Sequence, residues 1–165
     1  LPESLLTIEL LAFLDCCSLS EVTIPKNVQT IGCWAFLRCK SLQKITLLGA
    51  QTGPDVKSQD PFEDVEAPIV APNMPLGDLP IFWKQRAVWG FALEQHCYSG
   101  ERQGEHLKYI RSQRKRLYPL ALRQQELLLL MCGEDVIPPK DVQALLGEAD
   151  RQGNTAAKKM ILAHQ

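Results

Sequence analysis

A motif of the same length occurs twice near the start of this 165-residue chain. The segment IELLAFLDCCSLSEVTI begins at Ile8, and the segment IGCWAFLRCKSLQKITL begins 23 residues later at Ile31. When residues 1–24 are aligned with residues 24–47, the matched apolar positions remain apolar in both copies. A single unit of this size cannot bury its apolar side alone, whereas stacked units share a continuous core. The repeat therefore predicts equivalent turns of chain that stack on one another.

Each copy contains a short segment with the periodicity of a β-strand. In residues 21–24, EVTI, polar and apolar residues alternate, which predicts a strand with one face directed inward. Pro25 follows and limits the hydrogen-bonded ladder there. Phe36 lies in a turn-like or short helical segment and is expected to fill the space between the strand layer and the outer layer. Each copy thus predicts one strand, a bend, and a segment that leads the chain back to the start of the next strand.

The second copy carries a recognisable family pattern. Residues 24–42, IPKNVQTIGCWAFLRCKSL, resemble the BspA-type leucine-rich repeat of bacterial proteins. That pattern runs strand-Ile-Pro, Val-x-x-Ile-Gly, Ala-Phe-x-x-Cys and Ser-Leu. The resemblance covers residues 1–47, and the first copy departs from it at Glu9, where the second copy has Gly32. It implies a leucine-rich-repeat solenoid, a bacterial source and, for some relatives, exposure at the cell surface.

Beyond Leu47 the repeat becomes irregular. The segment 47–65, LLGAQTGPDVKSQDPFEDV, has Gly, Pro and Asp residues where a third copy should turn. We expect a degenerate third turn with a long loop, in which Phe62 replaces the phenylalanine of the repeat. The segment 67–72, APIVAP, is expected to form the last strand, with its prolines marking an edge.

The second half of the chain has helical periodicity from Asp78 onward. Apolar residues recur at helical spacing from Trp83 to Phe91, and Ser99 is expected to cap a helix that reaches about Arg116. Pro119 suits the first position of the next helix, and Gly133 suits its C-terminal cap. The last two predicted helices begin at Pro138/Pro139 and after a cap at Asn154. The segment 142–164 also resembles an ankyrin-type helix pair.

These patterns predict an α+β protein with two domains. Residues 1–76 are expected to form a short leucine-rich-repeat solenoid of two clear turns and a degenerate third, and residues 77–165 an all-α domain of about five helices. The two halves carry opposite net charges. Residues 1–76 contain 5 basic and 9 acidic residues, a net charge of −4, and residues 77–165 contain 13 basic and 10 acidic residues, a net charge of +3. The connecting segment 71–82 is rich in Pro and apolar residues. We therefore expect Leu76, Phe82 and Trp83 to contact the last repeat near Ile69.

The sequence contains few signals of catalysis or metal binding. It has no Ser-His-Asp set, GxSxG elbow, phosphate-binding loop, HExxH or CxxC motif, so we predict no enzyme activity and no cofactor. His96, Cys97 and His106 are metal-ligand types, but adjacent residues point to different sides of a helix, so no metal site is predicted. Cys16 and Cys39 occupy equivalent repeat positions and are expected to be buried and reduced.

Two surfaces are candidates for binding. The outward residues of the predicted strands are Glu21, Thr23, Lys44 and Thr46. A plain solvated sheet with a Glu21–Lys44 cross-strand pair is the favoured interpretation of this face, because the segment contains so few repeats. The one basic concentration contains Lys108, Arg111, Arg114, Lys115 and Arg116. A solvated helix face is the favoured interpretation of the basic segment, because apolar residues at positions 107, 110 and 117 occupy the opposite side of the helix.

We therefore predict a non-enzymatic module that binds a protein or peptide, or a surface glycan. Two alternatives stay open: a nucleic-acid-associated helical module that uses residues 108–116, and an enzyme with a site at the domain junction. The net charge of −1 produces no overall field that favours nucleic acid or a membrane. The longest apolar run, Leu127–Cys132, is too short to span a membrane. Because the sequence begins inside a repeat and without Met, we expect further repeats before it. Both a cytoplasmic and a cell-surface or secreted location stay open.

Overall fold

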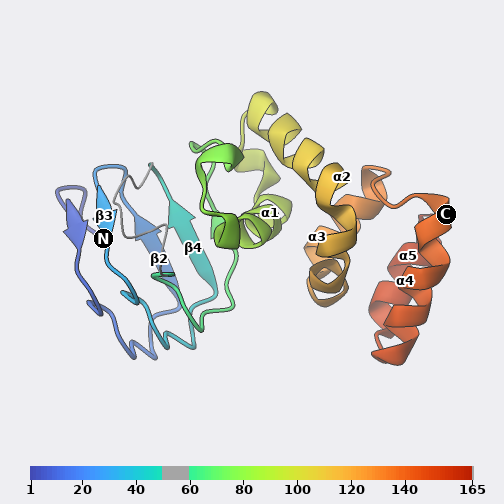
Figure 1. Cartoon of the computed structure of the whole chain (residues 1–165), viewed down its shortest axis with the longest axis horizontal. Coiled ribbons are helices and arrows are strands. Elements are labelled where there is room, and N and C mark those ends of the chain that lie inside the picture. The colour runs from blue at the N-terminus through green and yellow to red at the C-terminus, as the bar shows by residue number, and fades with distance from the viewer. Residues whose placement is uncertain (50–59, 165) are drawn as a thin grey trace. The chain divides into compact units, whose positions relative to one another are not determined.

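The computed structural model describes residues 1–49 and 60–164, and its fold is α+β (Figure 1). The described strands are β1 (Thr7–Ile8), β2 (Glu21–Ile24), β3 (Thr30–Ile31), β4 (Lys44–Leu47) and β5 (Ile69–Val70). The described α-helices are α1 (Lys84–Leu93), α2 (Gly100–Arg123), α3 (Gln125–Gly133), α4 (Pro139–Arg151) and α5 (Thr155–Ala163). Short 3-10 helices are η2 (Leu76–Asp78), η3 (Ile81–Trp83) and η4 (Gln95–Cys97).

The chain forms two compact units, unit 1 (Leu1–Arg102) and unit 2 (Gln103–Gln165). Unit 1 extends beyond the predicted repeat domain because α1 packs against β5. A compact unit is not thereby shown to fold by itself. The division into domains 1–76 and 77–165 therefore stays a prediction.

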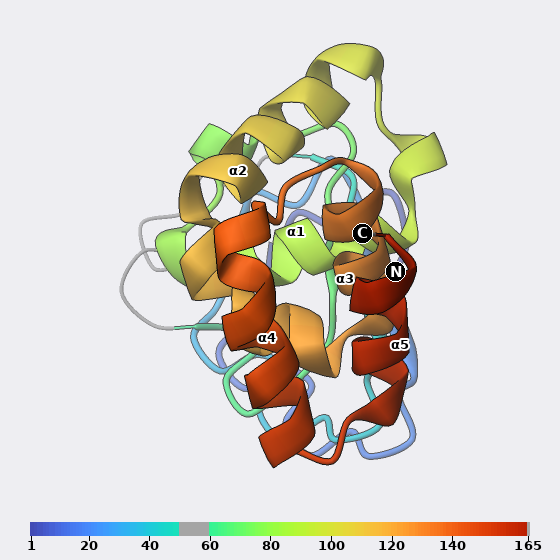
Figure 2. The ribbon, with the colours of Figure 1, turned by 90° about the vertical axis from the view of Figure 1, so that its right-hand side faces the viewer.

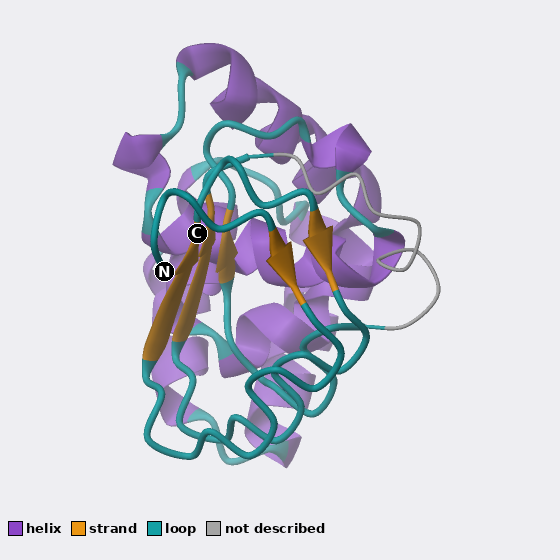
Figure 3. Cartoon of the chain, turned by 90° about the vertical axis from the view of Figure 1, so that its left-hand side faces the viewer, coloured by secondary structure: helices purple, strands orange, loops and turns teal. Residues whose placement is uncertain are grey.

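The repeat sets the pairing of the strands in unit 1. The strand order of one parallel sheet is β2-β4-β5, and β1 pairs with β3 in a second parallel sheet (Figure 3). Glu21 lies opposite Lys44, and Thr7 lies opposite Thr30. The partners in the β1–β3 and β2–β4 pairs are 23 residues apart, which is the period of the sequence. Alternate residues of β2 are buried and exposed, as the EVTI pattern predicts.

The third turn of chain keeps this arrangement although its sequence has diverged. Ile69 of β5 lies opposite Ile45 of β4, 24 residues earlier, so APIVAP does supply the last strand. Three residues with positive φ, Asp15, Arg38 and Asp64, each follow a phenylalanine by two positions, which shows that the same bend occurs three times. Most of the predicted long loop, residues 50–59, lies outside the described residues.

A stack of aromatic rings runs through the turns. The ring centroids are 4.8 Å apart for Phe13 and Phe36 and 4.9 Å apart for Phe36 and Phe62, with the rings nearly parallel. Trp83 continues the series at 5.5 Å from Phe62. Phe36 is fully buried between its neighbours. This confirms the predicted positions of Phe36 and Phe62 and the expected contact of Trp83 with the last turn. Phe13, which the repeat predicts as a core residue, does stack on Phe36 but is only half-buried.

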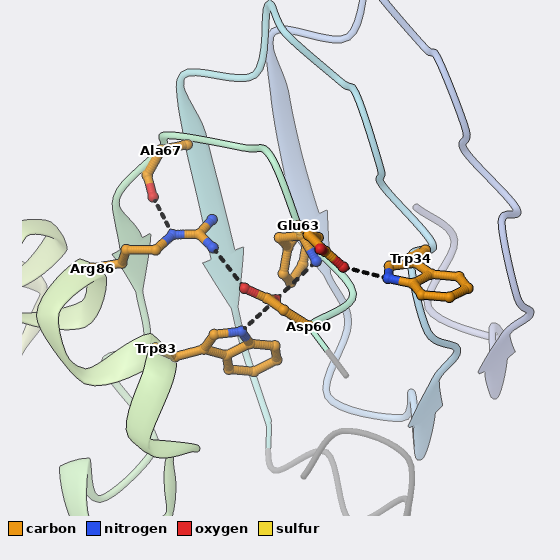
Figure 4. A network of polar contacts seen from close by, with 7 residues as sticks. Trp34, Asp60, Glu63, Ala67, Trp83 and Arg86 are labelled. Carbon is orange, nitrogen blue, oxygen red and sulfur yellow. Dashed lines mark hydrogen bonds and ion pairs between the residues drawn. The ribbon is translucent and has the colours of Figure 1, made fainter. Parts of the chain in front are cut away.

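A polar network fixes the helical segment to the third turn (Figure 4). The Asp60 carboxylate accepts hydrogen bonds of 2.9 Å from the Trp83 indole and from the Phe62 backbone N–H, and it lies 3.6 Å from the Arg86 guanidinium. Arg86 also donates to the Ala67 carbonyl at 2.8 Å. Burial lowers the pKa of Arg86, and the Asp60 charge opposes that shift. One carboxylate therefore joins the third turn to the continuous segment formed by η3 and α1.

Replacing Asp60 with Asn is expected to lower the stability of unit 1 by about 1–2 kcal/mol, because the hydrogen bonds lose a charged acceptor and Arg86 loses its counter-ion. The measurement is urea denaturation followed by tryptophan fluorescence, since all three tryptophans lie in unit 1. Asp78→Asn, at an exposed position, is the matched control. Equal midpoints for the two variants would show that the network does not contribute to stability.

The phenol of Tyr98 holds the chain after α1 against β5. The backbone N–H of Ala71 donates to the Tyr98 oxygen at 2.9 Å, and the Phe91 ring contacts the Tyr98 ring edge-on at 5.2 Å. Burial raises the pKa of Tyr98 to about 12. Because this folded-state pKa lies above the ordinary value of 10.0, the stabilisation is present below pH 10 and declines as the pH rises towards 12.

The variant Tyr98→Phe is expected to lower stability by about 1–3 kcal/mol, because the buried Ala71 N–H loses its acceptor. It should also remove part of the decline in stability above pH 10. Denaturant midpoints at neutral and alkaline pH measure both effects. An unchanged midpoint at neutral pH would contradict the role given to this hydrogen bond.

Unit 2 contains most of α2 and all of α3, α4 and α5. Helices α4 and α5 lie side by side, and α5 also contacts α3 (Figure 2). The predicted Asn154 cap is confirmed, because its side chain accepts a 3.0 Å hydrogen bond from the Ala157 N–H. None of the described helices is both long enough and apolar enough to cross a bilayer. The ankyrin-type resemblance of residues 142–164 stays a prediction.

The predicted helix start at Pro119 is wrong. Helix α2 continues through Pro119 to Arg123, and the break falls at Gln124, whose backbone is extended. A proline inside a helix removes one backbone hydrogen bond. The buried residues Leu117, Ala121 and Leu122 lie on both sides of Pro119, and their burial offsets that loss.

Candidate functional site

The outward strip consists of Glu21, Thr23, Lys44 and Thr46, the predicted binding residues. They lie on β2 and β4, where Glu21 is opposite Lys44 and Thr23 is opposite Thr46. The residues between them along the strands point the other way and are buried. Glu21 and Thr23 are exposed, and Lys44 and Thr46 are half-buried. The strip is therefore a polar surface supported by a packed core.

Lys44 connects two carboxylates at the strip. Its Nζ lies 3.7 Å from Glu21 on the neighbouring strand and 3.7 Å from Glu94 at the end of α1. The Glu21–Lys44 pair is the cross-strand pair expected from the period. Exposed ion pairs of this kind contribute about 0–1 kcal/mol, so a ligand can replace them at little cost.

The strip ends at β4. Val70 on β5 lies opposite Thr46 but is buried, and α1 packs against β5. The exposed polar surface is consequently two strands wide among the described residues.

The basic segment 108–116 is partly neutralised within unit 2. Arg111 lies 3.5 Å from Glu134, and Arg114 lies 3.5 Å from Asp141. Lys108, Lys115 and Arg116, the other three cations of the segment, are exposed. The segment is therefore not a row of five cations available to phosphate groups.

Asp141 also accepts a 2.7 Å hydrogen bond from the Tyr118 hydroxyl. This hydrogen bond, together with nearby Lys115 and Arg114, lowers the pKa of Asp141, while burial and the Asp141 carboxylate raise the pKa of Tyr118. The carboxylate therefore remains ionised and the phenol neutral across the physiological pH range. The pair acts as a structural link between α2 and α4 that needs no change of protonation state.

A groove of about 420 Å³ lies between α2 and α4 of unit 2. Its apolar wall includes Pro119, Leu122 and Leu145, and its rim carries both cations and carboxylates, among them the close pair Arg151–Glu148 at 2.6 Å. Such a groove can hold an apolar side chain. Sequence reasoning missed it because the groove depends on how two helices pack, and no single periodic pattern encodes that.

The two repeat cysteines differ in burial. Cys39 is buried, its Sγ lies 3.1 Å from the Phe13 carbonyl oxygen, and burial raises the pKa of its thiol. Cys16 is only half-buried, which corrects the expectation that both are buried. Cys16 lies in the first turn, where a neighbouring described turn covers one side only. All six cysteines are free thiols in the structure.

A third group combines metal-ligand side chains at the end of α1. Ligand atoms of Glu94, His96 and Cys97 all lie within 4.8 Å of one another. The expectation that His96 and Cys97 point apart assumed a regular α-helix. They lie instead in the 3-10 turn η4, which follows Glu94 directly. His106, the third predicted candidate, is buried in α2 and is not one of the three.

The comparisons with known proteins concern the repeat part of the chain. No curated protein and no solved structure matches the sequence. The family model described as the BspA type leucine rich repeat region, with six copies, matches residues 1–53. The N-terminal third of the chain is thus similar to BspA-type leucine-rich repeats, as its 23-residue period and its Ala-Phe-x-x-Cys pattern predicted.

Proposed function

We propose that this chain is a non-enzymatic interaction module that binds a protein or peptide through the outward strip. The observation that carries the proposal is the placement of Glu21 and Thr23 opposite Lys44 and Thr46 on a surface whose reverse side is core. The similarity to leucine-rich repeats supports an interaction role in general. We further infer that the stacked turns form a short solenoid.

The chemistry of the strip suits a polypeptide ligand. Two adjacent strands present an acid opposite a base and a hydroxyl opposite a hydroxyl, about 4.8 Å apart across the sheet. Peptide groups and polar side chains can form hydrogen bonds with all of these groups. The core beneath the strands already fixes their backbone. The strip therefore loses little conformational entropy when a ligand binds.

Three other predictions, namely nucleic-acid binding, a glycan partner and a bacterial source, are not part of this proposal. Nucleic-acid binding through residues 108–116 loses support from the pairing of Arg111 and Arg114 with carboxylates. A glycan partner and a bacterial source stay predictions that follow from the resemblance alone.

The test compares two variants that each add two negative charges. Thr23→Glu/Thr46→Glu alters the strip, and Gln125→Glu/Gln143→Glu alters exposed positions of α3 and α4. Immobilised protein retains partners from a cell extract, and the Kd of each purified partner is then measured. We expect the strip variant to weaken binding about tenfold or more, and the control to bind like the unaltered chain. Failure to find a partner that distinguishes the two variants would contradict the proposal.

A further inference from the structure

The geometry points to a zinc site formed by Glu94, His96 and Cys97. The site borders the outward strip, because Lys44 of the strip pairs with Glu94, but it does not require a ligand on the strip. These residues offer a carboxylate oxygen, an imidazole nitrogen and a thiol sulfur. Nitrogen and sulfur ligands select zinc over the oxygen-seeking cations Mg²⁺ and Ca²⁺. Three protein ligands leave a fourth position for water, as in open zinc sites.

The distances between the ligand atoms fit a tetrahedral ion. Zinc bonds of about 2.0–2.3 Å at tetrahedral angles place ligand atoms roughly 3.3–3.8 Å apart. The distance from Glu94 Oε2 to His96 Nε2 is 3.5 Å, and that from Glu94 Oε2 to Cys97 Sγ is 3.9 Å. Two of the three separations therefore lie close to the bound geometry before any ion binds.

The backbone that carries the ligands is held on both sides. The N–H of Glu94 donates to the Gly90 carbonyl at the end of α1, and the N–H of Cys97 donates to the Glu94 carbonyl at 2.9 Å. Tyr98, the next residue, is buried and accepts a hydrogen bond from Ala71 N–H. The ligands thus extend from a fixed turn, and binding needs only side-chain adjustment.

The two oxygens of Glu94 have different neighbours. Oε1 faces the Lys44 ammonium at 3.7 Å, whereas Oε2 faces His96 and Cys97. Lys44 therefore satisfies one oxygen and leaves the other directed at the two softer ligands. On binding, the cation takes the place of the Cys97 thiol proton, which is released to solvent, and His96 binds as the neutral imidazole.

The experiment uses the reduced 165-residue chain and Co²⁺ as a spectroscopic probe for zinc. Thiolate ligation of Co²⁺ produces a charge-transfer band, and tetrahedral coordination produces intense visible bands. We expect one equivalent of Co²⁺ to give both, and one equivalent of Zn²⁺ to remove them. Calorimetry with Zn²⁺ in two buffers of different ionisation enthalpy should also show proton release.

Three variants assign the signal. Cys97→Ser should abolish the charge-transfer band, and His96→Ala and Glu94→Gln should each weaken Zn²⁺ binding at least about tenfold. Cys17→Ser removes another exposed thiol and should leave the titration unchanged. Circular dichroism checks that every variant is folded, which is expected because Cys97 and His96 are exposed.

Two results would overturn the inference. One is the absence of a saturable cobalt band with the folded, reduced chain. The other is a band that survives Cys97→Ser, which would assign the metal to other thiols. Neither result depends on a ligand of the outward strip, so failure here and failure of the proposed function are distinguishable.

Discussion

Replacing Phe36 with alanine is expected to lower the free energy of unfolding of unit 1 by about 3–5 kcal/mol. Phe36 is fully buried, and its ring lies between the rings of Phe13 and Phe62 at 4.8 and 4.9 Å. Removal of the ring leaves a cavity that stacked turns cannot close without breaking their register. Because a small domain has a stability of about 5–15 kcal/mol, this single change removes a large fraction of it.

Urea denaturation followed by tryptophan fluorescence measures this loss. The matched control is Phe82→Ala, because Phe82 is 36 % exposed and contacts Trp83 only edge-on. The Phe36 variant should unfold at a much lower urea concentration than the Phe82 variant. Similar midpoints for the two variants would mean that the aromatic stack is not the centre of the core.

The second large effect is expected for Gly90→Ala in α1. Helix propensity alone predicts that this change stabilises the chain by about 1 kcal/mol. The structure predicts the opposite sign, because an added Cβ would overlap the Ile69 carbonyl oxygen and lie 2.5 Å from its carbonyl carbon. Backbone atoms cannot rotate away, so α1 and β5 must separate. We expect a net loss of about 3 kcal/mol, near the upper end of typical overpacking costs.

Gly147→Ala in α4 is the matched control for this prediction. Gly147 also lies inside a helix, but a Cβ added there meets no atom within 4 Å. The Gly147→Ala substitution should therefore raise the stability of unit 2 by about 1 kcal/mol, the difference in helix propensity between Gly and Ala. Fluorescence reports on unit 1 and far-ultraviolet circular dichroism on the helices of unit 2. Stabilisation by both substitutions would contradict the close approach of α1 to β5.

The repeat predicted the pairing of the strands and the stacking of the aromatic rings. A constant spacing between equivalent residues fixes which residue pairs with which, so the register of β2 with β4 and the Phe13–Phe36 stack follow from counting. Phe62 and β5 were also predicted, from residue type rather than from spacing. Pro119 shows the limit of local rules, because tertiary burial on both sides of it outweighs its preference for a helix start.

One candidate site could be predicted from the sequence, and the other could not. The outward strip is a direct consequence of strand periodicity, and its four residues lie together as predicted. His96 and Cys97 were predicted to point apart, because the sequence does not reveal that η4 replaces a regular helix at residues 95–97. Glu94 was missed altogether, since one carboxylate among 19 acidic residues carries no signal until the turn brings it to its neighbours.

The packing of α1 against β5 makes one end of the stack of turns different from the other. A free strand edge can recruit further strands, including those of other molecules. Because Gly90 lies against the backbone of Ile69, this end of the sheet is closed to such additions. An engineer who wishes to lengthen the array should therefore insert copies with the 23-residue period before β2 or between β2 and β4, and leave residues 60–98 intact as the terminal piece.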